Sequence, residues 1–162
     1  ALGDALAIAT MKQRKFNKKD FKRIHPAGSL GAQLKTVEDI MLKDNAIPFV
    51  NENLKIKDAL KVLSKKKLGF LLVRDAKKLS RGFVSDGDIR RLTQKKQNLH
   101  NISIKEIMTK NPIGIDKNAL AASALSLMSQ RKITSLCVYE KKNKLKTIGV
   151  IHIHNILQSN IS

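Results

Sequence analysis

Gly82-Phe83-Val84-Ser85-Asp86-Gly87-Asp88 begins as an apolar run and ends as the start of a helix. The apolar pair predicts a strand that delivers Ser85 to the first helical turn. Free backbone amides at such a turn favour an anion, and the Ser85 hydroxyl could join them on a phosphate. The Asp88 carboxylate, one turn further, could accept hydrogen bonds from a ribose diol. Ser-x-x-Asp is also the spacing of a capping box, which needs no ligand, so the local pattern leaves both interpretations open.

This pattern belongs to a repeat that covers most of the chain. Three segments of the first half recur 65 to 67 residues later: Val37–Met41 as Ile104–Met108, Ala59–Ser64 as Ala124–Ser129, and Gly82–Ser85 as Gly149–His152. A doubled unit of this size is one supersecondary module that covers its apolar face with its twin. Two such halves leave a cleft between them, and small ligands bind in clefts.

The two copies predict the same order of elements: short helix, strand, helix, strand, strand, helix. Each opens on a capping-box pattern, Thr36-Val37-Glu38-Asp39 in one and Ser103-Ile104-Lys105-Glu106 in the other. The long amphipathic helix of each copy follows from apolar residues at helical spacing, namely Ile56, Ala59, Leu60 and Leu63 in the first and Ala121, Ala124, Leu125 and Met128 in the second.

The remaining elements are placed by short apolar runs and polar connections. Extended pieces are expected at Ile47–Val50 and Ile113–Ile115, hairpin strands at Phe70–Val73 with Gly82–Val84 and at Leu136–Tyr139 with Ile148–Ile151, and closing helices at Asp86–Leu92 and Ile153–Gln158. The polar stretches Asp75–Ser80 and Glu140–Lys146 are expected to connect the hairpin strands, and residues 94–101 to link the copies.

The chain is strongly basic, with a formal charge of +19 over 162 residues, of which 42% are apolar. Such charge is typical of proteins that bind nucleic acid or anionic membranes. Most of the 32 basic residues are lysines spread along the whole chain, and one tyrosine and no tryptophan are available to stack on bases. We therefore interpret the charge as favouring phosphorylated small ligands, not nucleic acid.

The sequence also contains indications of where in the cell the protein is located. It has no apolar run near the length of a membrane span and no signal-peptide pattern. Cys137 is the single cysteine, so it cannot form an internal disulfide, and we expect a buried, inert thiol. The prediction is a cytoplasmic protein without a membrane partner.

The order of elements and the Gly-x-x-Ser-x-x-Asp motif resemble the cystathionine-β-synthase-type (CBS) domain family over residues 36–159. The family motif is Gly, two apolar residues, Thr or Ser, two of anything, then Asp, which Gly82, Ser85 and Asp88 match. The resemblance implies a mixed α/β (α+β) fold in which tandem CBS domains pair into a Bateman module. It also implies adenosine-type nucleotides in the clefts, with Ser85 on phosphate and Asp88 on ribose.

The second copy departs from the motif. His152 replaces the hydroxyl residue and Asn155 replaces the aspartate. An imidazolium can still meet a phosphate and an amide can still contact a diol, so we expect two ligand clefts that are not equivalent. His152-x-His154 could alternatively hold a metal from one strand face, but no third ligand is visible at a suitable spacing, and we expect no metal.

The N-terminal segment resembles the arabinose-5-phosphate isomerase family. The residues that carry this are Gly3-Asp4-Ala5-Leu6-Ala7 and the loop His25-Pro26-Ala27-Gly28-Ser29-Leu30-Gly31, followed by the CBS pair. That family joins a sugar isomerase (SIS) domain to C-terminal CBS domains and interconverts D-ribulose 5-phosphate and D-arabinose 5-phosphate. The resemblance implies that His25 is the catalytic histidine, whereas a loop histidine that only shapes the turn is the alternative.

The predicted organisation is a short helical tail of a SIS domain at residues 1–35, CBS domain 1 at 36–98 and CBS domain 2 at 99–162. We expect a fragment that is inactive alone and that regulates a parent isomerase supplying Kdo and lipopolysaccharide biosynthesis. No cofactor is required; AMP, ATP or CMP-Kdo is the expected regulatory ligand. The missing SIS domain is the expected partner, with a homodimer through the CBS faces and a tetramer in the parent. A ligand-free dimerisation or scaffolding module is the alternative.

Overall fold

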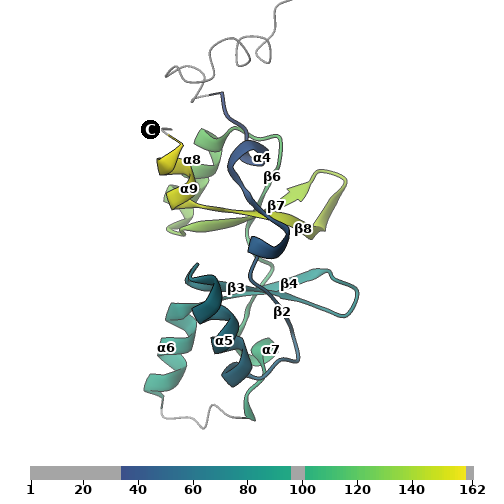
Figure 1. The fold of residues 1–162 in the computed structure, drawn as a ribbon, viewed down its shortest axis with the longest axis vertical. Helices are drawn as coiled ribbons and strands as arrows, with labels where there is room; N and C mark the ends of the chain where they lie inside the picture. The colour runs from purple at the N-terminus through teal and green to yellow at the C-terminus, as the bar shows by residue number, and fades with distance from the viewer. Residues whose placement is uncertain (1–33, 96–100, 160–162) are drawn as a thin grey trace, which may run out of the picture.

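The computed structural model describes residues 34–95 and 101–159. The predicted tail at residues 1–35, including His25, therefore lies outside the described residues apart from its last two positions. The described chain forms two halves stacked along the long axis of the molecule (Figure 1). In this part of the chain, no helix is both long and apolar enough to cross a membrane.

Within the described residues, the two copies contain the same helices and strands, and the first copy has one additional 3-10 turn. In the first copy these are α4 (Val37–Ile40), β1 (Leu42–Lys43), the 3-10 turn η1 (Asp44–Ala46), β2 (Phe49–Asn51), α5 (Ile56–Lys66), β3 (Phe70–Arg74), β4 (Ser80–Ser85) and α6 (Asp86–Gln94). In the second copy they are α7 (Ile104–Ile107), β5 (Thr109–Lys110), β6 (Gly114–Asp116), α8 (Ala121–Arg131), β7 (Ser135–Glu140), β8 (Asn143–His152) and α9 (Ile153–Gln158). The prediction of a mixed α/β fold built from two repeated units is confirmed.

Two details differ from the predicted elements. Residues 143–146 were expected in a polar connection, but they belong to β8, which begins at Asn143 and makes a tighter hairpin with β7. The two-residue strands β1 and β5 had no predicted counterpart.

Through these short strands, the first residues of each copy join the sheet of the other copy. β1 pairs with β8 of the second copy, and β5 pairs with β4 of the first copy. One sheet therefore has the order β1-β8-β7-β6 and the other β2-β3-β4-β5. Figure 1 shows the consequence, since α4 lies beside α8 and α9 in one half and α7 lies beside α5 in the other. The domain boundary between residues 98 and 99 was assigned from the sequence repeat and stays a prediction. It does not take into account that each copy contributes a strand to the sheet of the other.

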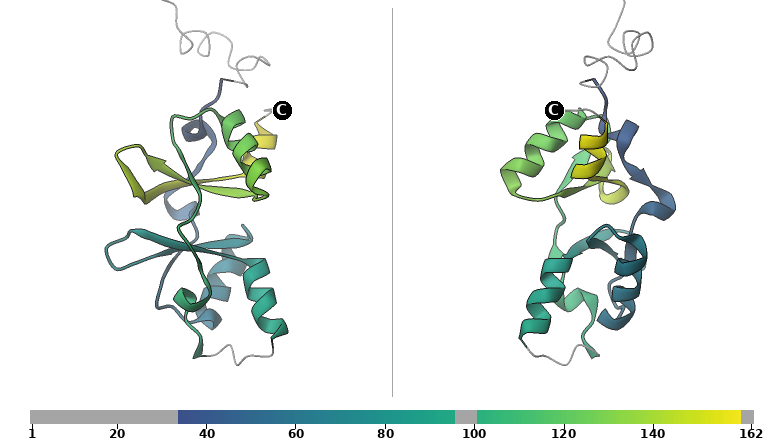
Figure 2. Two further views of the ribbon diagram at one scale, coloured as in Figure 1. Left: turned by 180° about the vertical axis from the view of Figure 1, so that it is seen from behind. Right: turned by 60° about the vertical axis from the view of Figure 1, so that its left-hand side comes forward.

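The core has three parts, two within the halves and one between them. One cluster packs α8, α9 and α4 on one sheet, and a second packs α5, α6 and α7 on the other. The third lies between the sheets and contains Ile47, Phe70, Leu72, Cys137 and Val150. The helices thus cover the outer faces of two sheets that face each other, which the turned views show (Figure 2).

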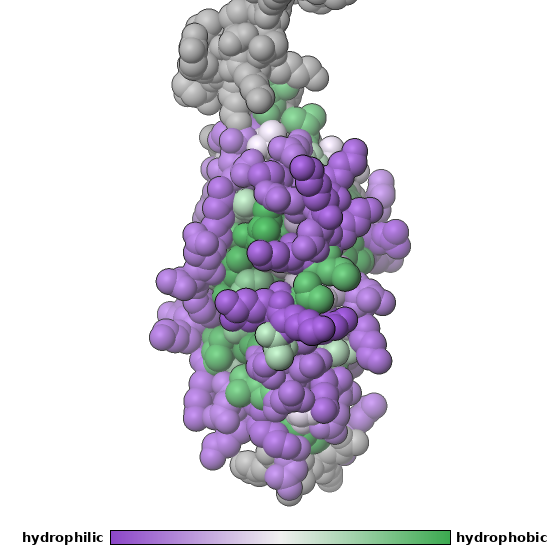
Figure 3. Space-filling view, turned by 90° about the vertical axis from the view of Figure 1, so that its right-hand side faces the viewer, coloured by the Kyte–Doolittle hydropathy of each residue, from purple (hydrophilic) through white to green (hydrophobic). Residues whose placement is uncertain are grey.

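Polar contacts also join the two hairpins. The Ser80 hydroxyl of β4 donates to the Thr147 hydroxyl of β8 at 2.7 Å, and the Thr147 amide donates back to Ser80 Oγ at 3.3 Å. Ser80 and Thr147 are 67 residues apart, so they are equivalent positions of the repeat. The face onto which the hairpins project is mostly hydrophilic, with apolar side chains showing between them near the middle (Figure 3).

Candidate functional site

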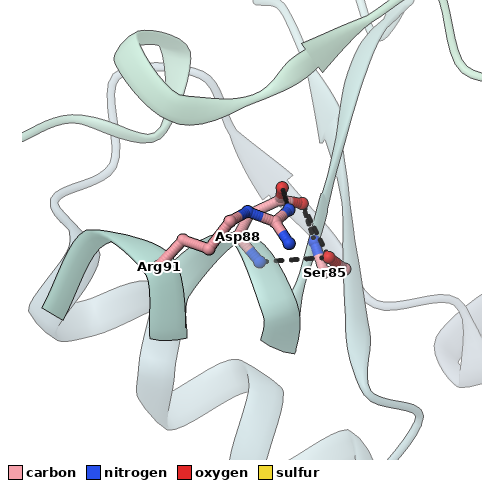
Figure 4. Close-up of polar contacts among 3 residues, drawn as sticks. All are labelled: Ser85, Asp88 and Arg91. Carbon is pink, nitrogen blue, oxygen red and sulfur yellow. Dashed lines mark hydrogen bonds and ion pairs between the residues drawn. The ribbon is translucent and has the colours of Figure 1, made fainter. Parts of the chain in front are cut away.

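Ser85 stands where the sequence predicted it, between the last residues of β4 and the first turn of α6. Its backbone is extended, at φ −97° and ψ 163°, and it is the N-cap of the helix. The Ser85 amide and hydroxyl donate to Asp88 Oδ2 at 2.8 and 2.7 Å, and the Asp88 amide donates to Ser85 Oγ at 3.2 Å (Figure 4). The capping box is therefore formed by the protein's own groups.

Asp88 is engaged through its second oxygen as well. Arg91, one turn further along α6, donates to Oδ1 at 2.5 Å (Figure 4). Burial by itself raises the pKa of the Asp88 carboxyl, but the Ser85 donors and the Arg91 guanidinium outweigh it and hold the pKa below the ordinary value. Asp88 is consequently a carboxylate at neutral pH, which is the form that could accept hydrogen bonds from a diol.

Ser85 and Asp88 line a pocket of about 540 Å³. Its wall draws on both halves of the chain: Leu68, Gly69, Phe70, Phe83, Ser85 and Asp88 come from the first copy, and Thr109, Asn111, Pro112, Ile113, Lys132, Ile133, Thr134, Ser135 and His152 from the second. A pocket of this size that combines apolar and aromatic walls with polar side chains has the character of a small-molecule site.

His152 lies at the same pocket wall, although the sequence placed it in a second cleft. It is the N-cap of α9, and its Nδ1 accepts a hydrogen bond from the His154 amide at 3.2 Å. An accepting Nδ1 carries no proton, and burial and the neighbouring His154 lower the pKa of the His152 imidazole. This arrangement disfavours the predicted imidazolium–phosphate pair, because protonation would remove the cap.

Asn155 has its side-chain oxygen in use. Its Oδ1 accepts from the His152 amide at 3.1 Å, which completes the equivalent of the Ser85–Asp88 box. Unlike Asp88, Asn155 is not among the residues that line the pocket. As for the alternative metal site, no group of three or more His, Cys, Asp or Glu side chains in the described part of the chain could hold a metal ion.

The rings of Phe83, Phe70 and His152 lie stacked at the pocket wall. Phe70 stacks on Phe83 with ring centroids 5.0 Å apart, and on the His152 ring at 6.5 Å with an interplanar angle of 4°. A second, smaller pocket of about 470 Å³ shares His152 with the first and is also lined by His154, Asp86 and residues at and just after the end of α5. The sites at the starts of α6 and α9 therefore differ in the residues that form them.

The pocket includes residues that sequence reasoning missed. Lys132, Thr134 and Ser135 follow the amphipathic helix α8, and Lys132 has a left-handed backbone with φ 55°. The repeat could have identified them. Lys67 follows α5 in the same left-handed conformation as Lys132 follows α8, and the residues after it, Leu68, Gly69 and Phe70, line the same pocket. Lys132 is the one cationic side chain among the pocket residues that the structure describes.

Comparison with known proteins agrees with this geometry. The CBS domain family profile matches residues 37–95 and 104–161. The chain is 37% identical over 161 residues to arabinose 5-phosphate isomerase KdsD of Yersinia pestis, covering 99% of this chain and 48% of that protein. KdsD of Escherichia coli K12 gives the same identity and coverage. The chain thus spans about half the length of the curated relatives it matches.

Solved structures resemble the fold over most of its length. CBSX2 in complex with AMP has a TM-score of 0.68 at 26% identity, covering 76% of this chain and 94% of that one. The CBS domain pair of MJ0100 in complex with 5′-methylthioadenosine and S-adenosyl-L-methionine has a TM-score of 0.68 at 22% identity, covering 77% and 94%. At that lower identity the likeness concerns the fold alone.

Proposed function

The chain belongs to the CBS domain family, and we propose that it is the regulatory nucleotide-binding part of an arabinose-5-phosphate isomerase. The observation that carries the proposal is the pocket between the halves, which brings the Ser85–Asp88 motif together with residues of the second copy. The 37% identity to KdsD over nearly the whole chain supports the parent enzyme, and CBSX2 with bound AMP supports the ligand class.

The pocket suits a nucleotide chemically. Phe70 and Phe83 offer an apolar surface for a base, and the Asp88 carboxylate offers acceptors for a ribose diol. Ser85 at the start of α6 and the Lys132 ammonium offer donors and positive charge for a phosphate. AMP, ATP and CMP-Kdo all contain a base, a ribose and a phosphate, and they are the ligands we propose.

Regulation requires the ligand to favour one conformation of the parent enzyme over another. The parent would interconvert D-ribulose 5-phosphate and D-arabinose 5-phosphate, which moves a proton between adjacent carbons. His25, outside the described residues, is the proposed acid/base group, with the SIS domain supplying the rest of the sugar site. This chain alone is therefore proposed to be inactive and to act through the domain that precedes it.

One observation favours a different function. Both Asp88 oxygens already have protein partners, so the motif is satisfied without a ligand. A module of this kind could serve as a ligand-free dimerisation or scaffolding plate. Binding, and not the geometry of the motif, distinguishes the two.

The test is calorimetric titration of the chain with AMP, ATP and CMP-Kdo. We expect heat with at least one of them and a loss of about tenfold or more in affinity for Asp88→Asn, since an amide is a weaker acceptor than a carboxylate. Asp39→Asn is the matched control, because Asp39 forms the same box with Thr36 at 2.7 Å but is not a pocket residue. Absence of binding by all three nucleotides would favour the scaffold.

A further inference from the structure

The Ser135 hydroxyl is a buried polar group without a hydrogen-bond partner among the described residues. Ser135 is only 7% exposed, yet it lines the pocket that contains Ser85 and Asp88. A buried hydroxyl that has given up water without gaining a partner is destabilising. Native proteins contain few such groups, and each one calls for an explanation.

The direction of the Ser135 side chain follows from its place in β7. Successive side chains of a strand point to opposite faces of the sheet. Leu136 packs in the cluster under the helices, whereas Cys137 packs in the cluster between the two sheets. Ser135 shares the face of Cys137, so its hydroxyl is directed toward the opposite half and the pocket between them.

Two stacked rings separate Ser135 from the start of α6. Ser135 pairs with His152 in the β7–β8 ladder, and Phe70 pairs with Ser85 in the β3–β4 ladder. The Phe70 and His152 rings, nearly parallel at 4°, both line the pocket between these pairs. A ligand that reaches from Ser85 and Asp88 to Ser135 would lie beside these aromatic rings, which suit a planar heterocycle.

The repeat indicates that the fold does not require a hydroxyl here. Phe70 holds the equivalent position in the first copy, since it pairs with Ser85 as Ser135 pairs with His152. We propose that the Ser135 hydroxyl binds the polar edge of the ligand's heterocyclic base, while Ser85 and Asp88 face its sugar and phosphate. A hydroxyl both donates and accepts, so it can pair with a ring nitrogen or an exocyclic amino group. This inference rests on the proposed nucleotide site.

The test compares Ser135→Ala with the wild-type chain, using whichever of AMP, ATP and CMP-Kdo binds the wild type most tightly. Calorimetric titration is expected to show an affinity about tenfold lower for the variant. Thermal unfolding without nucleotide is expected to show a melting temperature equal to or above that of the wild type, because a destabilising buried hydroxyl has been removed. Ser123→Ala, at an exposed position of α8, is the matched control and should change neither quantity.

A ligand contact predicts lower affinity with an equal or higher melting temperature, whereas a structural role predicts that both affinity and melting temperature fall. Equal affinity of Ser135→Ala and wild type would overturn the inference and leave the nucleotide site standing. A lower melting temperature together with lower affinity would assign the hydroxyl to the fold, and would also overturn it. If the wild-type chain binds none of AMP, ATP and CMP-Kdo, the proposed function fails first, and the inference fails with it.

Discussion

At the scale of single residues, the N-caps of α6 and α9 show how one position of a repeat can carry different chemistry. Ser85 caps α6 with a hydroxyl, and His152 caps α9 with a ring nitrogen that can accept only while it is unprotonated. The cap on α9 is therefore lost when His152 is protonated, and the pKa of His152 is lowered from its ordinary value. The cap on α6 instead depends on a carboxylate whose pKa is held below its ordinary value.

We predict that the protein loses stability as the pH falls below about 6.5, the ordinary pKa of histidine. Burial and His154 lower the pKa of His152 in the folded state, so the unfolded chain takes up the proton first. This contribution to stability is thus present above the unfolded pKa and is lost as the pH falls. Melting temperatures at pH 7.5 and 5.5 measure it, because the described acidic groups with shifted pKa values are shifted downward and titrate below this window.

His152→Asn isolates the responsible group. Asparagine is a favourable N-cap and does not titrate, so α9 keeps a cap at both pH values. The variant should show a smaller fall in melting temperature between pH 7.5 and 5.5 than the wild type, with the other histidines unchanged. An undiminished fall would assign the pH dependence to another group.

Some residues of the candidate site could be proposed from the sequence, and others could not. Ser85 and Asp88 could be identified because strand, helix start and spacing all lie within one continuous segment. Lys132 and Ser135 could not, since their place at the pocket depends on how the second half packs against the first. The position of His152 at the same pocket, and not in a separate cleft, depends on the same packing.

At the scale of elements, periodicity predicted the helices and hairpins but not the exchange of β1 and β5. Each is two residues long, Leu42–Lys43 and Thr109–Lys110, which is too short for an alternating pattern. Their partners lie in the other half of the chain, so no local signal marks the pairing. The glycine that recurs in both copies is explained by this crossing, because a side chain at Gly82 or Gly149 would meet the residues that lead into β5 or β1.

We predict that Gly149→Ala lowers the free energy of unfolding by about 2 kcal/mol, as overpacking of a tight core contact does. A Cβ at Gly149 would collide with Met41 Sδ and lie 3.0 Å from the Leu42 carbonyl oxygen, which is backbone and cannot rotate away. Gly82→Ala is the matched comparison, since its nearest atoms all belong to the flexible Met108 side chain. Denaturant titration of both variants is the measurement, and an equal or larger loss for Gly82→Ala would contradict this account.

At the scale of the whole molecule, the exchange makes each half depend on residues from both copies. Val37 opens the first copy, yet it is fully buried in the cluster of α8 and α9. Ile104 opens the second copy and is fully buried in the cluster of α5 and α6. Together with the apolar cluster between the sheets, this coupling predicts that the two halves unfold in one cooperative transition.

The coupling predicts a crossed effect of two core substitutions. Val37→Ala should lower the free energy of unfolding by about 2 kcal/mol and Ile104→Ala by about 3 kcal/mol, because each leaves a cavity in a packed cluster. Hydrogen exchange with mass spectrometry would locate the change: protection should fall mainly in β6–α9 for Val37→Ala and mainly in β2–α6 for Ile104→Ala. Each variant serves as the control for the other. Loss confined to the copy that contains the substitution would show that the halves do not share their opening segments in solution, and the pocket between them would lose its structural basis.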